Sequence, residues 1–418
     1  MSQPRAGART DAGGGAAVPA RFVRDRLTLT LYAPFITWGW FLYGFSPAVP
    51  LIAEEQGISR GQAGLHGTAM ALGTIATGLV SSRVAQRFGR KAQALVGGVV
   101  LCVGVALLLA GSTLPATLLA CFVTSVGGNL TISAAQPALS VHNGPSGPAA
   151  VTEANAMGAM VGLLAPLALG AAVGSGLGWR PAVALVVVLA VVAAVVLLPI
   201  RGDGALGRGA VTRSVPVAEG PSDRSDRSFS RTFWFFWAAL LAGVAIEFGT
   251  TFWASELIVQ RTGAPASLAA ASISALVGGM TLSRLVVGPL STRKAPEKLL
   301  LIGYGLAGAG WLVFWLATTP WLAIVGLVVA GLGYGTHYPL AVSLTLRASD
   351  GRPDDAQARA SVGTGAAVAV APFLLGSLAD VFGAHQAFLL IPVLVLVGAV
   401  AVALGLRSVH QAARTPTA

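Results

Sequence analysis

The chain has 418 residues, of which 55% are hydrophobic and only 10% are charged, and its mean hydropathy is +0.75. A soluble protein carries about 25% charged residues, so this composition excludes a soluble globular domain. The net charge of +11 would suit nucleic acid. The basic residues of this chain, however, lie in the short segments between long apolar ones, so we expect no nucleic-acid partner.

The apolar residues form twelve segments long enough to cross a bilayer, for which a helix needs about 20 residues. These segments predict an all-α membrane protein with twelve transmembrane helices. In chain order they cover roughly residues 27–53, 63–82, 93–111, 115–139, 151–175, 181–200, 232–258, 266–290, 298–317, 320–346, 360–380 and 385–406.

The basic residues are distributed unevenly between the two sides of the predicted membrane. If the amino terminus is cytoplasmic, every Lys and Arg falls on the cytoplasmic side except Arg60, Arg180 and Arg261 outside and Arg284 within a span. This asymmetry is the positive-inside rule. We therefore expect a multi-pass protein of the cytoplasmic membrane, in contact with lipid, with both termini in the cytoplasm.

A polar, Gly/Ser/Pro-rich segment at residues 201–231 separates six spans from the next six, which is typical of a flexible linker. The predicted organisation is two six-helix bundles with short tails. The boundaries are 1–26 for a disordered cytoplasmic tail, 27–200 for the first bundle, 201–231 for the linker, 232–407 for the second bundle and 408–418 for a second tail.

The two halves share a register of 206 residues. This offset carries the basic turn 83–91 onto 289–297, Gly57 onto Gly263, and the Ala-Pro pair at 165–166 onto 371–372. Because each half has an even number of spans, the copies are predicted to be parallel repeats. Such repeats flank a central path through the membrane in many transporters.

Six plus six spans, a central linker and a basic turn after the second span of each half resemble the major facilitator superfamily. That family's signature runs Gly-x-Leu-x-Asp-Arg-x-Gly-Arg-Lys; residues 82–91 keep the Arg-x-Gly-Arg-Lys end but have Gln86 in place of the aspartate. The resemblance implies a cytoplasmic gate, weakened because the acid is missing in both halves, while the alternative is that these cations only set topology. The implied gate residues are Gln86, Arg87, Gly89, Arg90, Lys91, Gly288, Thr292, Arg293 and Lys294.

Two other segments bear on the branch of that family. The fourth span reads FVTSVGGNL and lacks the arginine of drug–proton antiporters. The segment EFGTTFWASELI at 247–258 is similar to fucose-permease-like sugar transporters and their actinobacterial relatives.

Glu247 is the first candidate for coupling chemistry, because an ionisable group deep in a span is expensive and usually functional. It lies about 15 residues into its span, or roughly 22 Å by helical rise. Thr250 and Thr251 share its helical face. We expect a proton-coupling or substrate-binding carboxylate, with a structural hydrogen bond as the alternative.

His337, within GLGYGTHYPL, is the second proton-coupling candidate, because histidine titrates near neutral pH. The alternative is a packed core histidine. Arg284 either reaches back to the interface or pairs with an acid in the cavity. Glu54, Glu55, Glu256 and Asp380 fall at outer ends of spans, where we expect solvated carboxylates.

Aromatic and amide side chains in other spans suit a moderately polar small solute. With the residues above, the predicted substrate-cavity candidates are Trp40, Tyr43, Asn129, Gln136, Thr250, Thr251, Trp253, Arg284 and Tyr338. Tryptophan also anchors helices at the bilayer interface, which is the alternative for Trp40 and Trp253.

These features predict a secondary transporter that functions as a monomer and moves a small solute by alternating access with proton coupling. Alternatives are an efflux pump or uncoupled facilitator of the same fold, and a membrane sensor or scaffold that moves nothing. We find neither a phosphate-cradling loop nor a catalytic or metal-ligand constellation in the sequence. We therefore expect no enzyme, no cofactor and no metal.

Overall fold

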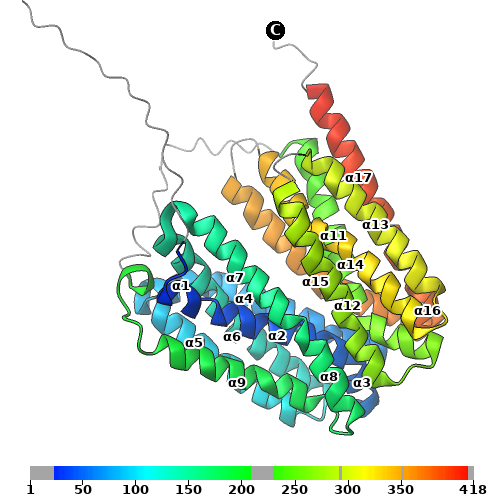
Figure 1. Ribbon diagram of the computed structural model, residues 1–418, viewed down its shortest axis with the longest axis horizontal. Helices are drawn as coiled ribbons and strands as arrows, with labels where there is room; N and C mark the ends of the chain where they lie inside the picture. Colours follow the sequence, from blue (N-terminus) through cyan, green and yellow to red (C-terminus); the bar gives the residue numbers. More distant parts are fainter. Residues whose placement is uncertain (1–22, 209–228, 291–293, 350–352, 413–418) are drawn as a thin grey trace, which may run out of the picture.

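The computed structural model describes residues 23–208, 229–290, 294–349 and 353–412, and this part of the chain folds into helices joined by short turns (Figure 1). Twelve helical segments are long and apolar enough to cross a membrane, which confirms the predicted fold class. The elements are α1 (Arg26–Thr30), α2 (Ala33–Phe45), η1 (Ser46–Ala48), α3 (Val49–Gln56), α4 (Arg60–Phe88), α5 (Arg90–Ala110), α6 (Leu114–Asn143), η2 (Gly144–Ser146), α7 (Gly147–Gly162), α8 (Leu164–Gly174), α9 (Arg180–Leu197), η3 (Gly204–Leu206), α11 (Arg231–Thr262), α12 (Ala266–Leu290), α13 (Pro296–Leu316), α14 (Pro320–Arg347), α15 (Pro353–Phe382), α16 (Ala384–Ala387) and α17 (Leu390–Ala412).

The helices before residue 208 pack mainly with one another, and so do those after residue 229. In the first half, α6 packs on α5 and α4, while α2 packs on α7 and α9. In the second half, α14 packs on α13 and α12, while α11 packs on α17 and α15. Two crossings join the halves most extensively, α4 with α15 and α8 with α12. We refer to the helices before residue 208 as the first half and to those after residue 229 as the second half.

The contacts inside the two halves repeat with the predicted offset of 206 residues. A Cβ on Gly104 would lie 2.4 Å from the amide nitrogen of Thr124, and one on Gly310 would lie 2.1 Å from that of Ala330. Both distances are too short for any side chain, so each glycine lets two helix backbones touch. Small residues at such crossings are typical of membrane helices. The same backbone approach at positions 206 apart supports a duplicated chain.

The turns also repeat. Gly57 ends α3 and Gly263 ends α11, both in the left-handed conformation with φ of 63° and 64°. Glycine favours this conformation because it lacks a Cβ, and it commonly ends helices there. Ser59 then caps the start of α4: its hydroxyl accepts a hydrogen bond from the amide of Gln62, and its own amide donates to the Gln62 side chain. At this end of the molecule the two halves are therefore built with equivalent turns.

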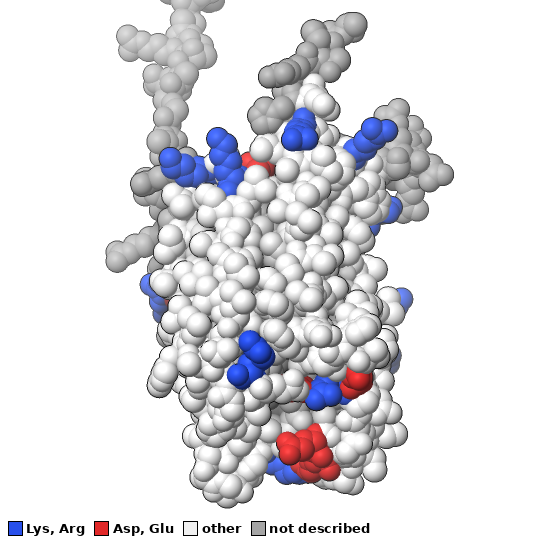
Figure 2. Space-filling view, turned by 90° about the vertical axis from the view of Figure 1, so that its right-hand side faces the viewer, with Lys and Arg blue, Asp and Glu red and all other residues white. Residues whose placement is uncertain are grey.

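One end of the molecule, which we call the linker face, carries the α4–α5 turn at Gly89, η3 and the last described residues of α17. The opposite end, the far face, carries the turns at Gly57 and Gly263. Figure 2 shows Lys and Arg side chains gathered at the upper end of the molecule. Over the middle of the face in this view, the surface below them shows no charged side chains, and acidic and basic side chains lie together towards the lower end. This distribution suits a chain whose middle lies in lipid.

The two halves touch near the far face and diverge towards the linker face (Figure 1). On α4, the helical stripe that faces α15 begins with Gly61, Gly64 and Thr68, and Thr68 Oγ1 donates to the carbonyl of Ala369 at 2.6 Å. The same stripe continues as Leu72, Ile75 and Leu79, which are 53%, 45% and 68% exposed. Because one face of one helix passes from close contact to exposure, the described parts of the two halves pack most closely at the far face.

The crossing of α8 with α12 has the same form. Ser274 Oγ donates to the carbonyl of Leu163 at 2.7 Å, whereas Leu282 and Leu285, farther along α12 towards the linker face, are 53% and 62% exposed. The structure therefore opens towards the linker face. Helix α17 continues to Ala412, beyond the predicted end of the second bundle at 407, and η3 gives the start of the predicted linker a short turn of helix.

Candidate transport site

Glu247 lies in the middle of α11 at the junction between the two halves. It lines a small pocket together with Phe248 and Thr251 of its own helix and with Leu42, Tyr43 and Ser46 of the first half. Thr251 Oγ1 donates to the backbone carbonyl of Glu247 at 2.5 Å, which bends its hydroxyl back along the helix. The Glu247 carboxyl group is therefore placed where movement of one half against the other changes its surroundings.

One cation and three tyrosines lie within electrostatic reach of this carboxyl group. Arg284 of α12 is within electrostatic reach of both Glu247 and Tyr43. Tyr334 and Tyr338, one helical turn apart on α14, are also within electrostatic reach of Glu247. A guanidinium and phenolic hydroxyls can donate hydrogen bonds to a carboxylate or to the oxygens of a solute.

The sequence predicts Tyr43, Arg284 and Tyr338 as separate cavity candidates, and in the structure all three lie within electrostatic reach of Glu247. Tyr334 is not among the predicted residues; its hydroxyl lies 3.1 Å from Thr250 Oγ1. Its spacing from Tyr338 could have identified it, because residues at positions i and i+4 lie on the same face of a helix. The Thr250 side chain is buried on the side of α11 that faces α14, where it meets the Tyr334 hydroxyl.

His337 lies inside the second half. Its ring stacks on that of Tyr304 with centroids 4.1 Å apart, and a Cβ on Gly243 would lie 2.6 Å from the Cβ of His337. Neither ring nitrogen has a partner of standard hydrogen-bond geometry in the described part of the chain, although the backbone of Gly303 faces the ring. His337 therefore lies on the side of α14 that packs against α13 and α11 of its own half.

Trp40 and Trp253 point into neighbouring helices and do not line the pocket at Glu247. The indole nitrogen of Trp40 donates to the carbonyl of Ala182 at 2.9 Å, and that of Trp253 donates to the carbonyl of Pro372 at 2.9 Å. Both side chains are buried. These two residues therefore tie together helices within one half, as satisfied indoles in a protein interior commonly do.

Asn129 and Gln136 both lie on α6, in the first half. Asn129 Nδ2 donates to Thr74 Oγ1 at 3.0 Å and to the carbonyl of Ser125 at 2.8 Å. Gln136 is exposed two turns closer to the linker face. They form a polar stripe on a helix of the first half, separate from the pocket that contains Glu247.

The basic turn of the first half holds the start of the linker. Arg90 is buried and donates to the carbonyl of Ala205 at 3.1 Å. Lys91 Nζ donates to the carbonyls of Leu198 at 2.8 Å and Ile200 at 2.6 Å. A cation at helix-terminal carbonyls is favourable, because these groups carry partial negative charge.

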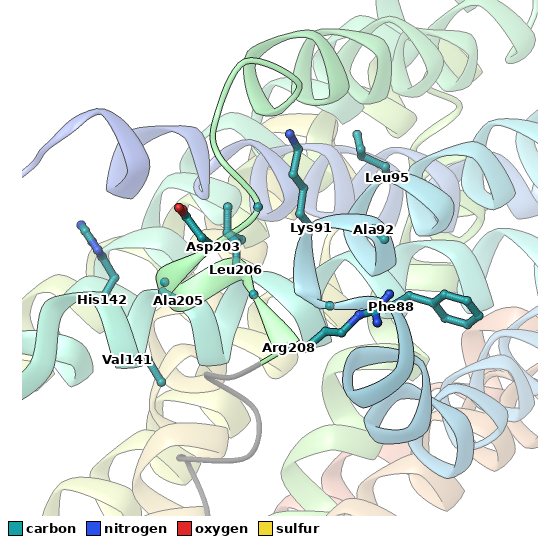
Figure 3. A pocket seen from close by; sticks show the side chains of 14 residues that line it. Phe88, Lys91, Ala92, Leu95, Val141, His142, Asp203, Ala205, Leu206 and Arg208 are labelled. Carbon is teal, nitrogen blue, oxygen red and sulfur yellow. The ribbon is translucent and has the colours of Figure 1, made fainter.

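Beside these contacts lies an open pocket of about 1100 Å³ at the linker face, lined by Lys91 and by residues 202–208 among others (Figure 3). Gly89, with φ of 85°, makes the turn between α4 and α5 that brings Arg90 and Lys91 there. Gln86 and Arg87 are exposed on the last turn of α4. Arg90 and Lys91, from the Arg-x-Gly-Arg-Lys end of the signature, thus hold the segment that follows α9 in place.

The equivalent turn of the second half is described only in part. Gly288 belongs to α12 and Lys294 is exposed after it. Thr292 and Arg293 lie outside the described residues.

Comparison with known proteins matches most of the chain to one family. Residues 35–353 and 257–418 match the model of the Major Facilitator Superfamily. The solved structures similar to this chain include a bacterial homolog of the human lysosomal transporter Spinster in an inward-facing and occupied conformation, with a TM-score of 0.73 and 15% identity over 94% of this chain and 98% of that one. The nucleoside transporter NupG has a TM-score of 0.71 and 12% identity over 91% and 98%. The peptide transporter POT in complex with sulfate has a TM-score of 0.72 and 16% identity over 96% and 97%.

Proposed function

Because this chain belongs to the Major Facilitator Superfamily, we propose that it is a secondary active transporter that moves a small solute by alternating access and couples that movement to protons through Glu247. The observation that carries the proposal is the position of Glu247 in a pocket built by both halves. A carboxyl group there changes its access to water when the halves move. Such a group can take up a proton on one side and release it on the other.

The orientation in the membrane is part of the proposal. The linker face carries Arg83, Arg87, Arg90 and Lys91 at the α4–α5 turn, and the positive-inside rule assigns such a face to the cytoplasm. With that assignment the structure is open to the cytoplasm and closed to the outside. Both termini are then cytoplasmic, and the protein resides in the cytoplasmic membrane.

The solute that suits this site is small and moderately polar. Arg284 and the hydroxyls of Tyr43, Tyr334 and Tyr338 supply hydrogen-bond donors around Glu247. Leu42 and Phe248 supply the apolar part of the pocket wall. Convergent polar groups in an apolar wall are typical of small-molecule sites. The resemblance of residues 247–258 to fucose-permease-like transporters favours sugars among the solutes to be screened first.

The proposal is tested with purified protein in proteoliposomes. A thermal-shift screen against sugars, amino acids and drugs identifies a solute, whose flux is then measured with and without an imposed pH gradient. We expect Glu247→Gln to bind the solute and exchange it between compartments, but to lose the accumulation driven by the pH gradient. Glu54→Gln is the matched control, because Glu54 is exposed at the far face and has no ion pair within the described ranges.

The outcomes separate the alternatives. Gradient-driven accumulation that survives Glu247→Gln unchanged places coupling elsewhere. A wild-type flux that ignores the pH gradient indicates an uncoupled facilitator. Outward flux driven by the gradient indicates an efflux pump, and binding without any flux indicates a sensor or scaffold.

A further inference from the structure

Three charged side chains from both halves meet at the far face. Arg60 begins α4 in the first half, whereas Glu256 belongs to α11 and Asp380 to α15 in the second. Arg60 Nε donates a short hydrogen bond to Glu256 Oε1, and Arg60 Nη1 lies 3.9 Å from Asp380 Oδ1. Gln260 Nε2 donates to the same Glu256 oxygen at 2.7 Å. The sequence-based expectation of a solvated carboxylate is therefore wrong for Glu256, which is only 14% exposed and bonded to a cation of the other half. Asp380 is exposed as expected, but it also faces that cation.

Asp380 also caps a helix that belongs to the other half. Its two carboxylate oxygens accept hydrogen bonds from the backbone amides of Arg60 at 2.8 Å and Gly61 at 2.7 Å. The first amides of a helix have no partner within the helix and carry partial positive charge. The hydroxyl of Ser59, directly before α4, accepts from the amide of Gln62 and not from those of Arg60 and Gly61. The start of α4 is therefore completed by a carboxylate that must leave when the halves separate.

The close packing around these groups makes their contacts specific to the closed far face. A Cβ on Gly61 would lie 2.7 Å from Ser377 Oγ, and one on Gly64 would lie 2.6 Å from the carbonyl of Pro372. Opening the far face moves α4 away from α15 and α11. That movement breaks the Arg60–Glu256 bond and exposes the two amides at once.

We propose that Arg60, Glu256 and Asp380 form a latch that holds the far face closed and sets the balance between the two states of the transport cycle. The latch rests on the alternating-access part of the proposed function but not on proton coupling. Hydrogen bonds in which one partner is charged are stronger than neutral ones. A set of them made in only one state shifts the equilibrium towards that state.

The latch exists at one of the two crossings only. The positions 206 residues away from Arg60, Glu256 and Asp380 are Ala266, Pro50 and Gly174, none of which is charged. At the α8–α12 crossing, Gly170 and Gly174 pack against Ser267 without an ion pair. The far face is thus closed by packing at one crossing and by packing plus charge at the other, so charge-removing variants act at one crossing alone.

The test measures distances between paired spin labels in protein whose Cys102 and Cys121 are replaced by alanine, reconstituted in lipid nanodiscs without solute or proton gradient. One pair, at Leu177 and Trp321, reports the far face, where both side chains are exposed at 66% and 72%. A second pair, at Ser82 and Val362, reports the linker face. We expect Asp380→Asn and Glu256→Gln each to lengthen the far-face distance and shorten the linker-face distance, with a roughly tenfold rise in the ratio of far-face-open to far-face-closed molecules.

The matched control is Glu55→Gln. Glu55 also carries an ion pair at the far face, but its partner Arg180 lies 2.6 Å away in the same half. We expect this variant to leave both distances unchanged, and Arg60→Lys, which keeps the charge, to retain most of the closed state. Opposite movement at the two faces is a readout that general loss of stability does not produce.

Unchanged distances in Asp380→Asn and Glu256→Gln would overturn the latch, and so would an equal shift in Glu55→Gln. The two latch variants are read independently, so poor folding of one leaves the other decisive. Because the measurement needs neither solute nor protons, a failed coupling test at Glu247 and a failed latch are separate results.

Discussion

Gly170 and Gly376, 206 residues apart, make the same contact in the two crossings that join the halves. A Cβ on Gly170 would lie 2.4 Å from the carbonyl oxygen of Ser267, and one on Gly376 would lie 2.5 Å from that of Arg60. Each glycine thus touches the first turn of a helix from the other half. The repeat is preserved at the surfaces where the halves meet, as well as inside each half, and a parallel repeat with equivalent interfaces suits rigid-body movement of one half against the other.

Gly376→Ala is expected to weaken closure of the far face, because its Cβ collides with the Arg60 carbonyl and with the ring of Trp253 at 2.8 Å. Overpacking of this kind costs about 1–3 kcal/mol. We expect a lower unfolding temperature, measured on purified protein, and a longer distance between labels at Leu177 and Trp321. Gly305→Ala is the control, since a Cβ there meets nothing within 4 Å. Equal effects of the two substitutions would contradict this account of the crossing.

His337 is expected to stabilise the second half through its stacked ring. Removing an aromatic ring from a core costs about 3–5 kcal/mol, so His337→Ala should unfold at a clearly lower temperature than wild type. His337→Phe keeps a ring against Tyr304 and should stay near wild type in both stability and gradient-driven flux. A His337→Phe variant that folds normally but loses its response to the pH gradient would instead make His337 a coupling residue.

Depth in the membrane was enough to select Glu247 from the sequence, because a carboxyl group so far into a span is rare and expensive. Its neighbours were predictable only in part. Arg284 and Tyr338 were chosen for their chemistry, but helical periodicity does not reveal which helices lie side by side. Their position near Glu247, together with Tyr43, depends on how four separate helices, α2, α11, α12 and α14, pack together.

The orientation of amphipathic side chains was harder to predict. Trp40 and Trp253 are residue types that often line a solute cavity, yet each indole nitrogen donates to a backbone carbonyl of its own half. The far-face latch was missed for a related reason. Each of its three residues, Arg60, Glu256 and Asp380, lies near the end of a span. From the sequence, a charged residue there is predicted to be solvated, and only the tertiary fold brings the three span ends together.

Arg90 is expected to anchor the segment that follows α9. Arg90→Met removes the hydrogen bond to the Ala205 carbonyl, so the amides of residues 198–208 should exchange hydrogen faster, as local opening predicts. Hydrogen–deuterium exchange with mass spectrometry of the intact protein measures this change. Arg87→Met is the control, because Arg87 is exposed and lies over the Phe88 ring at 5.4 Å. Unchanged exchange in Arg90→Met would show that Lys91 holds the segment without it.

Asp25 is expected to give the protein a pH-dependent contribution to stability at the linker face. Burial acts to raise the pKa of Asp25, but hydrogen bonds from the Thr28 backbone amide at 2.8 Å and from His142 at 2.6 Å outweigh it and lower that pKa below its usual value of 3.8. Because the folded-state pKa is the lower one, the stabilisation is present above pH 3.8 and is lost as the pH falls through the folded-state pKa.

Asp25→Ala should therefore lower the free energy of unfolding at neutral pH by up to about 1 kcal/mol, the value of a helix N-cap, reduced by solvent because the side chain is 43% exposed. The difference from wild type should shrink as the pH is lowered below 4, which thermal unfolding at a series of pH values measures. Ser59→Ala is the matched control, since the Ser59 hydroxyl caps α4 but does not titrate. The loss of unfolding free energy in Ser59→Ala should stay constant with pH. If the loss in Asp25→Ala is equally constant, the Asp25 carboxylate is not the source of the pH-dependent stability.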